Sequence, residues 1–597
     1  MSRRHNGAGE NGVVLQPSES HHERFEAVKY RWRWRAQTDE GEIAALARAA
    51  GLPRAVAAVL RARGVDTVQA AREFLHPTPE QLRSPWEFVH MEQAVERLEH
   101  ARCRDELVWV HGDYDVDGVS STALLVEFLR RSGLRVHYQV PNRFAQGYGL
   151  TVESAQQALQ AGAGVLIAVD CGTNSTEAIA WAQERGLDVL ICDHHELLGE
   201  LPPARALLNP RWEGSGYGFP DLAACGVVYK LVCALAERWG VGGVEELTDL
   251  VALATVADLV PMRGENRVLT AMGLERINRQ PRAGIAGLLH CSGLEPGSVG
   301  AAEVIFSLAP RLNAAGRLGD ARRAVELLLQ SDTGLAFRIA QELECENFRR
   351  RALAEQVSAQ AFARAEELLA QGRRSVVLYD PNWHPGVLGT AATRIAERFR
   401  VPVVLLSDVG GFLKGSARSG GAVNLLTLLA SCSAHLYEYG GHPFAAGVVL
   451  RPEQLEPFAA ALEQAACQEQ VQPAELPEMF VDAQLELVEI TPRFLALLRR
   501  MEPFGYGNYR PVFLTHGVTL RPCNGNSCRV HQGSVQLSAQ LMLEPAIVAN
   551  ATREAGAAKT VSIFYTITEQ GRTGEQPGLP LLRIYDVCPD SAQPCVK

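Results

Sequence analysis

The 597-residue chain has no apolar run that approaches the ~20 residues needed to cross a bilayer. Its first residues, MSRRHNGAGENG, lack the hydrophobic segment of a secretory signal. The 13 cysteines include no Cys-x-x-Cys pair, which disfavours a structural zinc site and favours reduced thiols in a cytoplasmic protein. An excess of positive charge is missing too, because the net charge is −10. This charge argues against a protein that coats duplex DNA by general electrostatics, but it allows a narrow basic channel beside an acidic site.

The most informative stretch is 107–129, LVWVHGDYDVDGVSSTALLVEFL. Four apolar residues predict a short buried strand, and an apolar-periodic helix follows. Between them, alternate positions are occupied by His111, Asp113, Asp115 and Asp117. Like charges crowded at one strand end must take up a proton or be neutralised by a cation. A hard divalent metal is the simplest neutraliser.

The same pattern recurs twice downstream. An apolar run over 165–169 leads into Asp170-Cys-Gly, and another over 189–192 leads into Asp193-His194-His195. Helix formers separate the runs, so the order of elements predicts parallel strands whose carboxyl ends share one edge. Asp258 stands later, at the end of an apolar helix. The candidate ligands, enough for two adjacent metals, are His111, Asp115, Asp117, Asp170, His194 and Asp258.

Each of these carboxylates also has an ordinary interpretation. A lone Asp after a strand is usually a turn former or a helix N-cap, and Asp-Gly is common in turns. What points to a metal centre is the joint occurrence of His-x-x-x-Asp-x-Asp, Asp-Cys-Gly and Asp-His-His at three strand ends.

Other segments carry residues suited to nucleic acid. Arg143 and Tyr148 lie in a Gly-containing strand exit, where they would clamp a phosphate and stack a base, or simply form a turn with a packed Tyr. The segment 311–317, RLNAAGR, places cations around small residues that let a backbone approach a ligand closely. Residues 29–35, KYRWRWR, suit nucleic acid less well than an edge strand that packs two Trp rings.

The second half of the chain divides into further units. Residues 335–369 contain no Pro or Gly and predict one helix, on the order of 50 Å long, that joins two lobes. Glycine-rich motifs around Ser416, Arg418 and His442 combine backbone N–H groups with polar side chains, which suits an anion, although each motif alone is more often a turn. Short alternating strands over 479–590 predict a small barrel.

The motifs GDYDVDG, VDCGT, CDHHE and ATVADLVP resemble the four motifs of the DHH phosphoesterase superfamily. The likeness spans about residues 50–590 and is strongest to bacterial exonucleases specific for single-stranded DNA, which share RLNAAGR. It implies an α/β fold with a parallel-sheet DHH domain, a long helix, a smaller α/β DHH-associated domain and an OB-fold β-barrel. The expected boundaries are 1–24 (disordered tail), 25–105 (helical lead-in), 106–330 (DHH), 331–373 (connecting helix), 374–466 (DHH-associated, DHHA1) and 475–590 (OB fold). The barrel segment carries Gly-Asn508-Tyr where the family usually has Gly-Asn-Pro.

The resemblance implies 5′ to 3′ hydrolysis of single-stranded DNA to mononucleotides, in repair and recombination. Two ions about 4 Å apart would serve this reaction, and Mn²⁺ is favoured over Mg²⁺ because imidazole joins the carboxylates. We expect His111 and Asp115 on one ion, Asp117, His194 and Asp258 on the other, and Asp170 between them. His195 is expected to face the scissile phosphate, and Asp113 and Asp193 to orient ligands.

The resemblance also implies how DNA and partners are bound. The expected DNA contacts are Arg143, Tyr148, Arg311, Asn313, Arg317, Ser416, Arg418 and His442. Single-strand-binding protein and recombination helicases are expected partners on the likeness alone, and we expect a monomer that does not bind membranes.

Two other functions compete with this prediction. Some superfamily members are small-molecule phosphoesterases, but those chains typically stop near the Gly-Gly-His motif, and this one continues into a barrel. Another member is a non-catalytic scaffold of the eukaryotic replicative helicase, and such a chain is expected to have lost ligands that are all present here.

Overall fold

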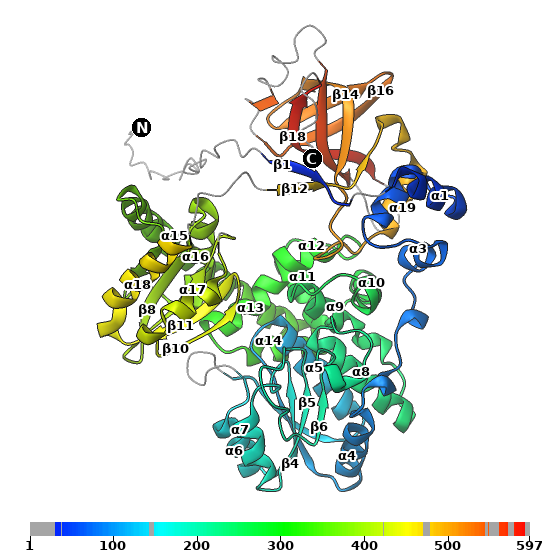
Figure 1. The fold of residues 1–597 in the computed structure, drawn as a ribbon. Coiled ribbons are helices and arrows are strands. Elements are labelled where there is room, and N and C mark those ends of the chain that lie inside the picture. Colours follow the sequence, from blue (N-terminus) through cyan, green and yellow to red (C-terminus); the bar gives the residue numbers. More distant parts are fainter. Residues whose placement is uncertain are drawn as a thin grey trace, which may run out of the picture.

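The computed structural model describes residues 30–36, 39–141, 149–421, 423–469, 478–543, 547–548, 560–570 and 578–590. The expected tail over 1–24 therefore lies outside the described residues. The chain forms a first α/β lobe, a second α/β lobe and a β-barrel. The second lobe and the barrel lie next to the helices of the first lobe (Figure 1). The fold class predicted from the sequence is confirmed.

The first lobe is built on a five-stranded sheet in which every pair of neighbours is parallel. In spatial order its strands are β3 (Arg135–Gln139), β2 (Leu107–His111), β4 (Ala163–Val169), β5 (Asp188–Cys192) and β6 (Ala206–Leu208). Side chains alternate between the two faces, so that Val108 and Val110 enter one core while Trp109 enters another. Both faces are buried, which is why these strands are continuous apolar runs.

Helices cover the two faces of this sheet separately (Figure 1). One face packs against α5 (Val116–Arg131), α8 (Ala224–Trp239) and α9 (Thr248–Ala257), and the other against α6 (Val152–Gln160) and α7 (Thr176–Gln183). The remaining helices of the lobe are α4 (Met91–Cys103), α10 (Gly264–Arg279), α11 (Ala283–Cys291), α12 (Ala301–Glu303), the π-helical turn η5 (Val304–Leu308), α13 (Ala309–Leu318) and α14 (Arg322–Leu329).

The predicted long helix is α15, which runs over Thr333–Ala370 and has 38 residues. Asp332 caps it by accepting from the backbone N–H of Leu335 at 2.7 Å. It leads into a mixed sheet with the order β10 (Glu438–His442), β11 (Ala445–Leu450), β9 (Phe412–Arg418), β8 (Val403–Val409) and β7 (Val376–Tyr379). This sheet packs between α15 with α16 (Pro385–Phe399) and α17 (Leu425–Ser431) with α18 (Leu455–Gln468).

The C-terminal strands form a closed barrel. Its strands are β14 (Phe513–Pro522), β15 (Ser527–Gln532), β16 (Val535–Leu541), β18 (Leu579–Pro589) and β17 (Val561–Gln570), and β17 pairs back with β14. The short strand β13 (Ala483–Gln484) pairs in parallel with the start of β14, and α19 (Pro492–Arg500) lies at the barrel's side.

The predicted lead-in over 25–105 contributes side chains to two different hydrophobic cores. Its first helices, α1 (Glu40–Ala50), α2 (Arg54–Arg61) and α3 (Val68–Leu75), share a core with the barrel, whereas α4 joins the first lobe. Strand β1 (Arg31–Trp34) pairs in parallel with β12 (Glu478–Val481), and Trp32 stacks on Phe564 with ring centroids 4.2 Å apart. The strand interpretation of this segment is therefore confirmed, but the packing of both Trp rings is not, because Trp32 is buried while Trp34 is exposed.

No disulfide bond joins the twelve cysteines among the described residues. No single helix in the described ranges is long and apolar enough to cross a membrane, and only the bent pair α1 and α2 passes that test, by length and composition alone.

Candidate metal centre

The carboxyl ends of β2, β4 and β5 lie side by side at one edge of the parallel sheet. His111 ends β2, Asp170 follows β4, and Asp193 follows β5, so the strand ends meet as the order of elements predicted. Asp170 has a left-handed backbone with φ of 60°. Asp and Asn tolerate this conformation better than most residues, which suits the residue type found there.

Asp115 and Asp117 are positioned by the start of α5. Asp115 caps the helix, since its side chain accepts from the N–H groups of Asp117 and Gly118 at 3.0 and 3.1 Å. The carboxylate of Asp117 is buried and accepts from the N–H groups of Ala224 and Cys225, both at 2.8 Å. These two N–H groups open α8, whose N-terminus favours negative charge. The N-cap interpretation is thus correct for Asp115, and it coexists with a place in the cluster.

His194 faces three carboxylates at once. Its Nε2 atom lies 3.4 Å from an oxygen of Asp170, 3.7 Å from one of Asp258 and 3.8 Å from one of Asp117. These separations are longer than ordinary hydrogen bonds. Nitrogen and oxygen donors that converge on one point without bonding one another form the arrangement that a divalent cation requires.

Burial and mutual repulsion perturb these groups strongly. Burial, followed by the charge of Asp115, raises the pKa of Asp117. Burial, followed by the charge of Asp117, also raises the pKa of Asp170 and of Asp258. Burial lowers the pKa of His194 to about 4, so its imidazole is neutral near pH 7 and offers a lone pair. A divalent cation would remove the carboxylate repulsion and accept that lone pair.

His111 is fully buried at the same edge. The backbone of Gly149 and the side chain of Gln139 are the polar groups beside its ring nitrogens. Burial lowers the pKa of His111 to about 4, which keeps the ring neutral. A neutral buried imidazole that is oriented by such groups has a lone pair to offer to a divalent cation.

Three groups of side chains bring ligand atoms within 4.8 Å of one another. They are Asp117 with His194 and Asp258, Asp170 with His194 and His195, and Asp113 with Asp115 and Asp170. Asp170 belongs to two groups, as a bridging ligand would. Asp113 stands among candidate ligands, although only an orienting role was predicted for it, and His111 is in none of the groups. The donor set fits divalent cations.

His195 is held by Asp193. Its Nδ1 lies 2.7 Å from an oxygen of Asp193, which also accepts from the N–H groups of His194 and His195 at 2.7 and 3.2 Å. Burial opposes charge on His195, but the hydrogen bond to Asp193 and its negative charge outweigh burial and raise the pKa of His195 to about 9. Burial opposes charge on Asp193 too, yet His195 holds the pKa of Asp193 well below its usual range. His195 is therefore a cation near pH 7.

Two supporting residues were missed from the sequence. The N–H of Thr173 donates to Asp193 at 3.0 Å, and the buried Asn209 donates from Nδ2 to the hydroxyl of Thr173 and to the carbonyl of His195, at 2.9 and 2.8 Å. Asn209 directly follows β6, as Asp170 follows β4. A polar residue after a fourth apolar run was the signal that would have found it.

The segment over 311–317 forms most of α13 and packs against the loop between β2 and α5, which carries Asp113 and Asp115. A side chain at Gly316 would meet the carbonyl of Tyr114 at 2.7 Å, so only glycine permits this approach. Asn313 and Arg317 are partly buried. Arg311 is buried, and its guanidinium contacts Glu344 at 2.6 Å and the Ser307 carbonyl at 2.6 Å. These contacts show that Arg311 has partners within the protein, and its DNA contact stays a prediction.

The predicted anion site of the second lobe lies on β9 and its neighbours. Arg418 donates from Nε to the hydroxyl of Thr393 at 3.1 Å, and a side chain at Gly389 would meet Arg418 at 2.8 Å and the Ser416 hydroxyl at 3.4 Å. His442 is exposed on β10, and both His442 and Arg418 pair with Ala445 of the intervening β11. These three residues thus share one sheet. The predicted contacts Arg143 and Tyr148 lie outside the described residues.

Models of three known families match the chain. The DHH family N-terminal domain matches residues 107–255, the DHHA1 domain 372–467 and the RecJ OB domain 481–540.

Curated relatives cover most of the chain. The single-stranded-DNA-specific exonuclease RecJ of Bacillus subtilis is 35% identical over 83% of this chain and 62% of its own length. The exonuclease of the same name from Salmonella typhimurium is 36% identical over 78% of this chain and 83% of its own length. A crystal structure of RecJ from Thermus thermophilus in complex with Mn²⁺ matches with a TM-score of 0.77 and 28% identity, over 94% of this chain and 79% of that one.

Proposed function

The chain belongs to the RecJ family of single-stranded-DNA-specific exonucleases, and on this premise we propose that it degrades single-stranded DNA with two divalent cations, Mn²⁺ or Mg²⁺. The observation that carries the proposal is the convergence of His194 Nε2 on three carboxylates at 3.4–3.8 Å. The reaction proceeds 5′ to 3′ and releases 5′-mononucleotides, in DNA repair and recombination.

The residues divide the work of the metal site. His111 and Asp115 would hold one ion, and Asp117, His194 and Asp258 would hold the other. Asp170 would serve both, and its membership of two donor groups supports this assignment. When bound, the pair of ions supplies charge that stabilises the attacking and the leaving oxygen of an in-line displacement at phosphorus.

His195 and Asp193 act on the phosphate beside this centre. The imidazolium of His195 places a positive charge where negative charge develops on the phosphoryl oxygens. Asp193 keeps the ring protonated and oriented, and Thr173 and Asn209 fix Asp193 and the backbone of His195 in turn.

The second lobe binds the 5′ end of the strand. Ser416, Arg418 and His442 lie on strands of one sheet and offer a hydroxyl, a guanidinium and an imidazole to a terminal phosphate. Asn313 and Arg317 hold the following phosphates. Holding the terminal phosphate in the second lobe leaves the next phosphodiester at the metals, which produces mononucleotides.

We further propose that the protein works in the cytoplasm as a monomer and does not bind membranes. No disulfide bond joins the twelve cysteines of the described residues, which suits a reducing compartment. Single-strand-binding protein and recombination helicases are its proposed partners, as the family likeness implies.

The experiment that tests the function is a digest of end-labelled single-stranded DNA that is blocked at the 5′ end, at the 3′ end or at neither. We expect a block at the 5′ end alone to stop the release of mononucleotides, and EDTA to stop it on every substrate. Release from a strand blocked at the 5′ end would refute the polarity, and undiminished release in EDTA would refute the role of the metals.

A further inference from the structure

A loop of the barrel region contacts the turn that follows the candidate ligand Asp258. Residues 502–508, EPFGYGN, follow α19 and contact the turn after α9, which carries Asp258. The N–H of Met262 in that turn donates to the carbonyl of Tyr506 at 2.7 Å. On its other side the turn is held by Asn266, whose Nδ2 donates to the carbonyl of Pro261 at 3.1 Å.

The turn needs such support because its backbone is unusual. Asp258 ends α9, and the next residue, Leu259, has a left-handed φ of 57°. Helices commonly end with a residue of this conformation, but the position is usually glycine, since an L side chain rarely adopts it. A non-glycine residue persists there when surrounding contacts determine the backbone. The hydrogen bond from Met262 to Tyr506 is one of those contacts, and Tyr506 belongs to the barrel region.

Two buried side chains fix the loop in place. The guanidinium of Arg267, on α10 of the first lobe, donates to the carbonyls of Arg500 and Glu502, both at 2.8 Å. The amide of Asn508 donates to the carbonyls of Met501 and Pro503 at 3.0 and 2.9 Å. Arg267 is 3% and Asn508 is 1% exposed, so both sets of bonds are shielded from water.

Asn508 is itself held by the lead-in. Its side-chain oxygen accepts from Nε of Arg63 at 2.8 Å, and Arg63 also donates to the carbonyl of Tyr509 at 2.6 Å. The loop is thus fixed by the helices before the first lobe and by the first lobe itself.

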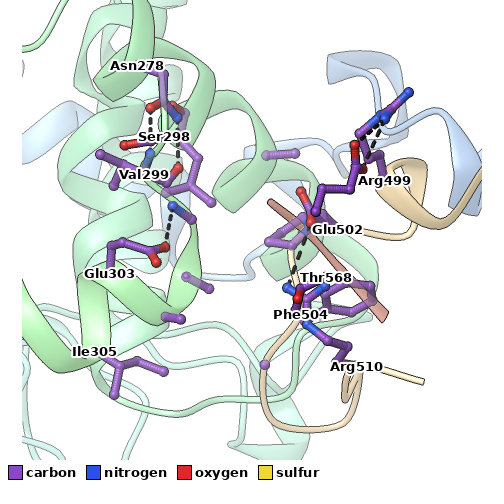
Figure 2. A pocket seen from close by; sticks show the side chains of 18 of the residues that line it. Asn278, Ser298, Val299, Glu303, Ile305, Arg499, Glu502, Phe504, Arg510 and Thr568 are labelled. Carbon is purple, nitrogen blue, oxygen red and sulfur yellow. Dashed lines mark hydrogen bonds and ion pairs between the residues drawn. The ribbon is translucent and has the colours of Figure 1, made fainter. Parts of the chain in front are cut away.

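A cavity of about 900 Å³ lies beside the loop, between the first lobe and the barrel. Figure 2 shows Asn278 and Glu303 on the wall from the first lobe, and Glu502 and Phe504 on the wall from the barrel region. Leu259 lines it as well, one residue after the metal ligand. Because the cavity leaves this part of the interface unpacked, the loop depends on its few hydrogen bonds to stay against the turn.

We infer that the loop over 502–508 is a positioning element of the metal centre, in which Asn508 and Arg267 hold the Tyr506 carbonyl against Met262 and thereby set the place of Asp258. The inference rests on the proposed function, since Asp258 is assigned there as a ligand. Neither Asn508 nor Arg267 touches the ions or the substrate. They act through the turn, and their loss weakens the site that Asp258 completes.

The test measures the binding of Mn²⁺ to the full-length protein without DNA, from the free-ion signal in electron paramagnetic resonance. The variants are Asn508→Ala and Arg267→Met, each with its circular dichroism spectrum recorded. Loss of a residue that orients a ligand typically weakens metal affinity by about 10- to 100-fold. We expect a loss of that size for one of the two ions and wild-type affinity for the other.

The matched control is Asn278→Ala on the opposite wall of the cavity. Asn278 donates to the carbonyls of Leu274 and Val299, both at 2.8 Å, and its contacts do not include the turn. This variant loses a partly buried amide that also donates to two backbone carbonyls, and it should bind both ions as the wild type does.

Hydrogen exchange at the Met262 amide shows whether the loop has moved. We expect faster exchange in both variants, together with the weaker binding of one Mn²⁺ ion. Faster exchange with unchanged Mn²⁺ affinity would overturn the inference, and so would unchanged exchange in both variants. A wild-type protein that binds no Mn²⁺ would instead overturn the proposed function.

Discussion

Asp170→Asn should stabilise the metal-free protein while destroying its metal site. The ligand atoms of Asp113, Asp115 and Asp170 lie within 4.8 Å of one another. At that separation and an effective dielectric constant of 20, each ionised pair repels by about 3 kcal/mol. A proton taken up by Asp170 already relieves part of this repulsion, so we expect a net gain of about 1–3 kcal/mol. Asn suits the left-handed backbone at this position and adds no strain.

The assay is thermal unfolding in EDTA and again in Mn²⁺. For a lobe of this size the gain corresponds to a rise of about 2–10 °C in EDTA. Wild-type protein at 100 times the dissociation constant should gain about 2.7 kcal/mol from a bound ion, and the variant should lose most of that gain. Turnover of single-stranded DNA should fall by orders of magnitude in the variant.

Asp249→Asn is the matched control for this prediction. Asp249 is also buried, but Arg282 donates to it from Nε and Nη2 at 2.7 and 2.8 Å. Removing its charge leaves the guanidinium without its main partner and should cost about 3 kcal/mol. The two variants should therefore shift the unfolding midpoint in EDTA in opposite directions. A lower midpoint for Asp170→Asn in EDTA, or an undiminished response to Mn²⁺, would refute the argument from crowded carboxylates.

Other predictions concern the substrate and the frame of the first lobe. His195→Gln should slow turnover by about 10²- to 10⁴-fold with Mn²⁺ affinity unchanged; loss of an ion would make His195 a ligand instead. Arg418→Ala should remove most of the preference for a 5′-phosphate over a 5′-hydroxyl at fixed salt, and an unchanged rate ratio would show that this residue does not read the terminus. Blunt duplex should be degraded far more slowly than single strands of the same sequence, and equal rates would contradict the proposed specificity. Lys230→Met should cost about 3 kcal/mol in thermal unfolding, because it removes the cation from the buried Glu265 and leaves only the hydrogen bonds from Tyr217 and the Arg83 backbone; an unchanged midpoint would mean that the pair is energetically neutral.

The sequence predicted well which sheet edge carries the candidate ligands, because the order of strands and helices along the chain determines that edge. An apolar run of strand length followed by Asp170 or Asp193, with a helix between the runs, is enough to bring both residues to one edge of a parallel sheet. The long helix was predicted equally well, since a stretch without Pro or Gly needs no tertiary information.

What the sequence could not predict depends on partners distant along the chain. Arg311 and Arg317 lie on the same helix, and their types and spacing do not show which one is buried. Arg311 is buried against Glu344 of α15, a contact that only the tertiary structure shows. Asn508 has the character of a turn former in sequence, whereas its partner Arg63 lies more than 400 residues earlier. No periodicity carries information over such a separation.

The pairing of β1 with β12 has a consequence for how the chain is made. About 440 residues separate Trp34 from Glu478, and at ~5–20 residues per second their synthesis takes roughly 20–90 s. During that time the apolar faces of α1, α2 and α3 wait for the barrel that completes their core. The first lobe has its own core and can fold in the interval, whereas α1, α2 and α3 leave the ribosome before it and are buried after it. A chaperone that shields short amphipathic segments would bind the nascent chain at these three helices.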